Sequence, residues 1–179
     1  MMRYFEDFAE GQVYDLGELR VSEPEIVEFA RKYDPQAFHV DPEAAQRSIF
    51  GGLIASGWHT GSMYMGLLVR GLLQQSATLG SPGVDEMRWL KPVRGGDLLR
   101  GRVTITSVRP SSKHAGRGAV GTLGELFNEQ GERVFFVRSA GIFARRPRDQ
   151  EESTAGISAR TTGSAAGQTS LRAAGRSRR

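Results

Sequence analysis

The chain has 179 residues, enough for one domain with a sizeable core and too few for two. It contains no cysteine, which excludes disulfide scaffolds, cysteine-ligated zinc and thiol catalysis. The net charge of +4 comes entirely from residues 146–179, with seven Arg and three acidic residues, because residues 1–145 hold 17 residues of each sign. The folded part is therefore neutral, and its charge does not indicate a nucleic-acid partner.

The C-terminal segment differs in composition from the rest of the chain. It is rich in Ser, Ala, Gly and Arg, and Ile157 and Leu171 are its two large aliphatic residues. Such a segment cannot bury enough apolar surface to offset the entropy of ordering it. We predict a domain at residues 1–146 and a disordered tail at 147–179. A basic tail of this kind can also contact RNA or anionic lipid, but a solvated extension is the simpler interpretation.

The hydropathy of the chain gives no sign of a membrane segment. No apolar run approaches the roughly 20 residues that span a bilayer, and the first residues, MMRYFEDFAEG, are acidic rather than signal-like. We therefore expect a cytoplasmic protein with no membrane partner.

Helix and turn signals dominate the first half of the chain. Ser22 precedes Glu25 in the S-x-x-E spacing of a capping box, and Pro24 suits a helical first turn. Asp-Pro occurs twice shortly afterwards and marks turns. The expected elements are a strand at 12–19, a helix at 23–32, a loop with short helical turns at 33–48 and a long apolar helix at 56–73.

Alternating apolar residues replace the helical period in the second half. The tetrapeptide Asn128-Glu129-Gln130-Gly131 is a hairpin turn signal between two such segments. A long antiparallel sheet with one apolar helix predicts an α+β arrangement in which the sheet wraps around the helix. The expected strands lie at 84–90, 97–108, 116–128 and 132–145.

Asp34 and His39 form the first candidate site. They lie five residues apart across a loop with apolar neighbours. An Asp beside a His is a general acid–base pair, since both groups titrate and together they can hold one water molecule. The alternative is a turn-forming Asp-Pro followed by a packed His.

The segment that leads into the long helix is the second candidate. Ser56 and Gly57 are small, so the first N–H groups of the helix are left open at the positive end of its dipole. Such groups stabilise a carbonyl oxygen that gains negative charge. A tight helix start without any catalytic role is the alternative.

Together these segments resemble the MaoC-like dehydratase family of hotdog-fold proteins, which includes the (R)-specific enoyl-CoA hydratases. In that family a D-x-N-P-[LI]-H loop supplies the catalytic Asp and His, and a glycine eighteen residues after the His opens the central helix. Asp34, His39 and Gly57 reproduce both spacings, and RWLKPVRGGD at 88–97 matches a family strand ending in P-V-x-x-G-D. The resemblance covers residues 3–146.

The chain departs from the family's pattern at three places. Gln36-Ala37 stands in place of Asn-Pro in the loop, and Ser56 in place of the usual His before the glycine. Met65 stands where a Ser is common. The Asp and the His themselves are retained.

The resemblance implies a hydratase or dehydratase that acts on the α,β double bond of an acyl-CoA thioester. Asp34 and His39 would be catalytic and would activate the water, and the Gly57 N–H would stabilise the enolate oxygen. No metal or redox cofactor is implied, because the thioester and the oxyanion site acidify the α-proton, and the CoA thioester is the substrate. The predicted substrate-binding residues are Ser56, Trp58, His59 and Arg88. For His59 a packed side chain is the simpler interpretation.

Two other functions remain open on the same fold: an acyl-CoA thioesterase and a non-catalytic acyl-CoA-binding subunit. Hotdog thioesterases commonly place their carboxylate on or beside the central helix. Between Glu43 and Asp85 the chain has no Asp or Glu. This gap favours the hydratase arrangement, in which the carboxylate comes from the preceding loop.

We also expect a homodimer or a higher even oligomer. A sheet curled around one helix leaves an unpaired edge, and a second copy can cover it. The resemblance implies an acyl-thioester channel along the subunit interface. Arg88, Lys91 and Arg94 are cations available for a CoA phosphate there, although a solvated strand end explains them equally well.

Overall fold

The computed structural model describes residues 1–147 of the chain, and its long elements follow the predicted order. In chain order the elements are η1 (Phe5–Asp7), β1 (Val13–Arg20), α1 (Glu23–Tyr33), α2 (Ala37–Val40), α3 (Pro42–Gln46), α4 (Gly57–Gly71), η2 (Leu73–Gln75), β2 (Thr78–Gly80), β3 (Val84–Trp89), β4 (Leu98–Pro110), β5 (Arg117–Phe127) and β6 (Arg133–Ala144).

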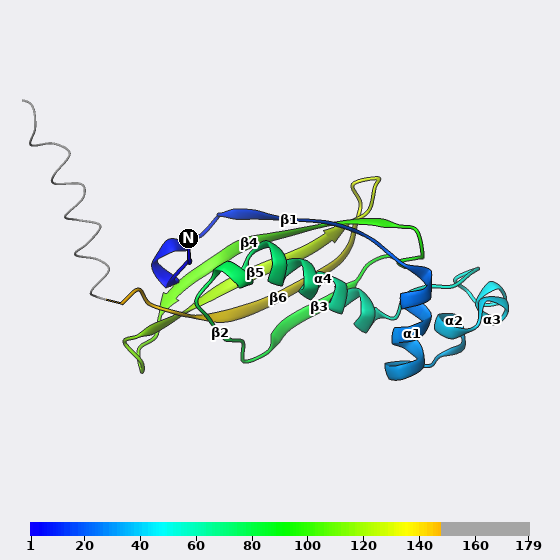
Figure 1. Ribbon diagram of the computed structural model, residues 1–179, viewed down its shortest axis with the longest axis horizontal. Coiled ribbons are helices and arrows are strands. Elements are labelled where there is room, and N and C mark those ends of the chain that lie inside the picture. Colours follow the sequence, from blue (N-terminus) through cyan, green and yellow to red (C-terminus); the bar gives the residue numbers. More distant parts are fainter. Residues whose placement is uncertain (148–179) are drawn as a thin grey trace, which may run out of the picture. The chain divides into compact units, whose positions relative to one another are not determined.

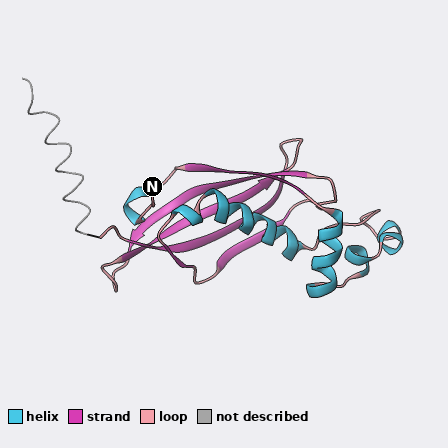
Figure 2. Cartoon of the chain, viewed as in Figure 1, coloured by secondary structure: helices cyan, strands magenta, loops and turns pink. Residues whose placement is uncertain are grey.

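The strands form one antiparallel sheet in the order β1-β4-β5-β6-β2, with β3 also paired to β6. The predicted hairpin turn joins β5 to β6: the Gly131 N–H donates to the Asn128 carbonyl over 3.0 Å. Gly131 has a φ of 75°, a conformation that glycine adopts without strain. Helix α4 lies across one face of this sheet, and α1, α2 and α3 gather at one end of it (Figures 1 and 2).

Helix α4 packs closely on the sheet because glycines on the strands leave room for its side chains. A Cβ on Gly124 of β5 would lie 1.9 Å from the Tyr64 hydroxyl, and one on Gly101 of β4 would lie 3.0 Å from Leu67 Cδ1. Tyr64 and Leu67 are both buried in the main hydrophobic cluster. Burial raises the pKa of the Tyr64 hydroxyl, and the nearby negative charge of Glu125 raises it further. The sheet and the helix thus share one core.

The predicted α+β arrangement is confirmed, with small differences at the ends of elements. Ser22 caps α1, since its Oγ accepts a hydrogen bond from the Glu25 N–H. Helix α4 starts at Gly57, because Ser56 is its N-cap residue, and it ends at Gly71. Strand β2 was not predicted, because three residues are too few to show an alternating pattern.

Two further predictions concern the C-terminal tail and membrane-spanning segments. The predicted tail lies outside the described residues apart from Pro147. Within residues 1–147, no helix combines the length and apolar character that crossing a bilayer requires.

The contact between Gly124 and Tyr64 predicts that Gly124→Ala destabilises the fold. The added methyl group overlaps the Tyr64 ring, and such overpacking costs about 1–3 kcal/mol. Gly116→Ala is the matched control, because a Cβ there meets nothing within 4 Å. Urea denaturation measures both variants. Equal free energies of unfolding for the two would contradict this account of the core.

Candidate active site

The structure brings Asp34 and His39 together. Asp34 is the C-cap residue of α1, and its N–H donates to the Ala30 carbonyl over 2.8 Å. His39 lies on α2, the single helical turn that follows. Its Nε2 is 3.4 Å from Asp34 Oδ2, and the two side chains are 5% and 19% exposed. The two residues that the spacing pairs are therefore in contact at the end of the sheet.

A backbone carbonyl fixes which nitrogen of His39 carries the proton. His39 Nδ1 lies 2.8 Å from the carbonyl oxygen of Ile54. A carbonyl oxygen only accepts, so Nδ1 must carry a hydrogen and donate it. In the neutral ring, Nε2 is then an acceptor with its lone pair toward Asp34.

Asp34 is held as a carboxylate by two side-chain donors. Ser56 Oγ donates to Oδ2 over 2.7 Å, and Gln36 Nε2 donates to Oδ1 over 2.8 Å. The Ser56 hydrogen bond holds the pKa of Asp34 below its ordinary value; Gln36 and the charge of His39 act in the same direction, and burial opposes them. Gln36, in place of the family's Asn, therefore still reaches the carboxylate.

Ser56 also sets the start of α4. Its Oγ accepts a hydrogen bond from the Trp58 N–H over 3.2 Å while donating to Asp34. The same hydroxyl therefore caps the helix and ties the cap to the carboxylate. Among residues 1–147, the Gly57 N–H has no acceptor, so this donor remains open at the positive end of α4.

Trp89 of β3 explains why residue 57 is glycine. Its Nε1 donates to the Gly57 carbonyl over 2.7 Å. A Cβ on Gly57 would lie 2.7 Å from Trp89 Cε2, so any side chain would displace the indole. The indole thus covers one side of the helix start. No sequence pattern predicts this contact, and the position of Trp89 beside the P-V-x-x-G-D motif is its one indirect signal.

His39 and Gly57 line the same groove. Its volume is about 380 Å³, and Phe38, Thr60, Trp89 and Lys91 also line it. One member of the polar pair, an open backbone donor and apolar walls therefore surround a single space, and Asp34 lies behind His39 in contact with its ring.

All four predicted substrate-binding residues lie outside the lining of this groove, and Ser56 is fully buried. Trp58 is 62% exposed and packs edge-on against Trp89. Arg88 is exposed and forms an ion pair with Glu86 over 3.1 Å. His59 lines a second groove, between α1 and α4.

His59 matches the packed interpretation. Its ring stacks on Phe29 with centroids 4.7 Å apart, and burial lowers its pKa. Residues on a helix are about 100° apart, so His59 lies about 200° around α4 from Gly57 and points away from the groove. Thr60, one residue further, returns to the groove side.

The chain is similar to a known family model and to several known proteins. Residues 7–124 match the family model described as "MaoC like domain". The Bacillus subtilis protein YdeM is 31% identical over 73% of this chain and 91% of its own. An (R)-specific enoyl-CoA hydratase of Rhodospirillum rubrum is 33% identical over 63% of this chain and 76% of its own.

Solved structures give the same result. A MaoC-like dehydratase of Rhodospirillum rubrum is 39% identical and covers 80% of this chain and 98% of its own, with a TM-score of 0.72. The predicted hotdog fold is thereby confirmed.

The Ser56 hydrogen bond yields a prediction for pH titration. Ser56→Ala removes the main donor to Asp34, so the pKa of Asp34 should rise toward its ordinary value. A carboxylate with a lowered pKa stabilises the fold above its ordinary pKa, and that stabilisation disappears as the pH falls through the folded-state pKa. The free energy of unfolding of the variant should therefore be lower at neutral pH and should fall less as the pH is lowered.

Carbon NMR of the Asp34 carboxyl group measures the change directly. Ser62→Ala is the control, because Ser62 Oγ donates to the Trp58 carbonyl on the same helix and does not touch Asp34. An Asp34 titration midpoint that is the same in Ser56→Ala and in the unmodified protein would show that Ser56 does not set this pKa.

Proposed function

Because the chain belongs to the MaoC-like domain family, we propose that it adds water across the α,β double bond of an acyl-CoA thioester or catalyses the reverse dehydration. One observation carries the proposal: His39, which contacts Asp34, lines the same groove as Gly57 with its open N–H. The similarity to an (R)-specific enoyl-CoA hydratase supports the reaction class.

The pair is suited to holding one water molecule. Asp34 Oδ2 and, in the neutral ring, His39 Nε2 are both acceptors, 3.4 Å apart. A water molecule can donate one O–H to each, which leaves its oxygen lone pair directed away from the pair. That lone pair then attacks the β-carbon of the bound alkene. The pair accepts a proton from the water and returns one to the α-carbon.

Attack at the β-carbon moves negative charge onto the thioester oxygen. The Gly57 N–H is a fixed donor with no other acceptor in the described chain, and the dipole of α4 points its positive end at the same place. A donor positioned before the reaction stabilises the enolate without reorganisation. The thioester itself acidifies the α-proton, so the proposal requires neither a metal nor a redox cofactor.

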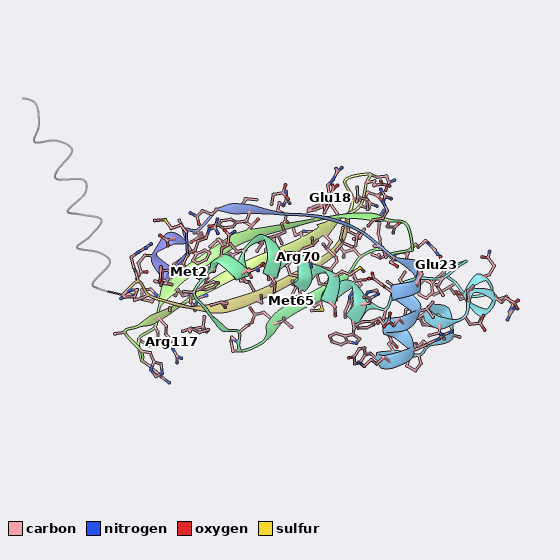
Figure 3. All side chains as sticks on the ribbon, in the orientation of Figure 1. Met2, Glu18, Glu23, Met65, Arg70 and Arg117 are labelled. Carbon is pink, nitrogen blue, oxygen red and sulfur yellow. The ribbon has the colours of Figure 1, made fainter. Side chains whose placement is uncertain are left out.

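The two sheet edges support a homodimer. Strand β1 is one edge, with a bulge between Asp15 and Gly17 that disrupts regular pairing. Strand β3 lies at the opposite edge (Figure 1) and exposes Val84 and Trp89. Met65, labelled on α4 in Figure 3, is half exposed and lines one cavity together with Val84. We therefore propose that the β3 edge pairs with a second copy.

Hydration of crotonyl-CoA tests the function. Loss of the absorbance of the conjugated double bond without thiol release is the expected result. Thiol release instead identifies a thioesterase, and binding without either change identifies a non-catalytic acyl-CoA-binding subunit.

Replacement of either member of the pair should abolish most of this activity. Asp34→Asn cannot accept the proton, and His39→Gln loses the ring nitrogen, so each should lower kcat by about 100-fold or more. Circular dichroism should show that both variants remain folded, because the pair lies outside the main core. Near-normal turnover by a folded variant would rule out a catalytic role for that residue.

The dimer is tested by light scattering at micromolar concentration. We expect about 40 kDa or a multiple of it, against 19.6 kDa for one chain. Val84→Lys places a charge on the β3 edge and should give a monomer. Val13→Lys, on the β1 edge, is the matched control, since Val13 and Val84 are 58% and 57% exposed. A fully active particle of single-chain mass would contradict the pairing.

A further inference from the structure

The segment between α3 and α4 supplies the carbonyl that orients His39. Backbone hydrogen bonds hold it on both sides: the Ile54 N–H donates to the Phe38 carbonyl over 3.2 Å, and the Ala55 N–H donates to the Val93 carbonyl over 2.8 Å. The Ile54 carbonyl then receives the hydrogen of His39 Nδ1. The position of this segment therefore determines the tautomer of His39.

Arg94 holds the same segment by its guanidinium group. Nη1 donates to the Leu53 carbonyl over 3.2 Å, and Nη2 donates to the Phe50 carbonyl. The backbone N–H of Arg94 is itself fixed by Asp97 Oδ2 at 2.8 Å. The guanidinium thus bridges two carbonyls of one loop, and Leu53 directly precedes Ile54.

The contacts of Arg94 are those of a structural clamp rather than of an ion pair. Within residues 1–147, no carboxylate lies within ion-pair distance of its guanidinium. The planar fork of arginine donates in two fixed directions, which a lysine ammonium does not reproduce. Nη1 also lies 3.0 Å from the position of a Cβ on Gly52, so the loop fits tightly around the guanidinium.

We propose that Arg94 is a positioning residue for His39. By fixing the Phe50 and Leu53 carbonyls, Arg94 keeps the Ile54 carbonyl where it receives the Nδ1 hydrogen, and this leaves Nε2 as the acceptor toward Asp34. The role in catalysis rests on the proposed function, whereas the effect on the tautomer does not.

This role differs from that of a cation for a CoA phosphate, which the sequence alone allows for Arg94. A phosphate contact would affect substrate binding, and lysine would largely replace arginine in it. A clamp on two carbonyls affects the orientation of His39, and lysine replaces arginine poorly. The two roles therefore predict different changes in KM, in kcat and in the NMR spectrum.

Nitrogen NMR of the full-length protein reads the tautomer directly. The chain has three histidines, so His39→Gln identifies the His39 signals by their loss. In the unmodified protein we expect neutral His39 to be protonated at Nδ1 alone. In Arg94→Met and in Arg94→Lys we expect a mixture of the two tautomers, because the Ile54 carbonyl is released.

Displacement of the His39 ring in the Arg94 variants should also lower kcat. Both Arg94 variants should lower kcat for crotonyl-CoA by about 10- to 100-fold and leave KM within about 2-fold, since displacements near 1 Å have effects of this size. Arg100→Met is the matched control: Arg100 is an exposed cation that pairs with Glu18 and contacts no part of the loop. It should change neither the tautomer nor kcat.

Each outcome decides the proposal. If Arg94→Met does not fold by circular dichroism, Arg94→Lys carries the test. A single Nδ1-protonated tautomer in a folded Arg94 variant overturns the proposal, and so does full recovery of kcat by lysine with a change in KM alone. If the unmodified protein does not hydrate crotonyl-CoA, the proposed function fails, but the NMR comparison still decides the role of Arg94.

Discussion

The hydrogen bond from His39 Nδ1 to the Ile54 carbonyl joins the helical turn after α1 to the segment that leads into α4. It assigns one nitrogen of the ring as donor and leaves the other as acceptor, 3.4 Å from Asp34. In the other neutral tautomer the Nδ1 lone pair would face the Ile54 carbonyl oxygen and Nε2 would be a donor, so a water molecule would lose one of its two acceptors. The chemistry that we propose therefore depends on where a single backbone carbonyl lies.

The fold supplies that placement through rigid elements on either side of the loop. Helix α4 is held on the sheet by close contacts such as that of Tyr64 with Gly124, and its first turn is capped by Ser56, which also binds Asp34. Trp89 on β3 fixes the carbonyl of Gly57. The sheet, helix α4 and the loop that carries Asp34 and His39 thus meet at one place.

The sequence predicts those parts of the molecule that depend on local pattern. Periodicity locates α4 and the long strands, and the five-residue spacing of Asp34 and His39 indicates the pair. The contacts made by Trp89 and Arg94 join residues 32 and 44 positions apart, and no local pattern encodes such distances. The direction of His59 could have been derived from the helical period, which places it on the opposite side of α4 from Gly57. Three-residue β2 is too short for any period.

The most direct test of the central claim is to follow the oxygen of water into the product. Mass spectrometry of crotonyl-CoA after incubation with the protein in water labelled with heavy oxygen should show the label on the β-carbon hydroxyl, with the thioester intact. The same experiment with His39→Gln should show almost no label. Label in a free carboxylate, with release of CoA, would contradict the account, because the Asp34–His39 pair would then direct water to the thioester carbonyl instead of the alkene.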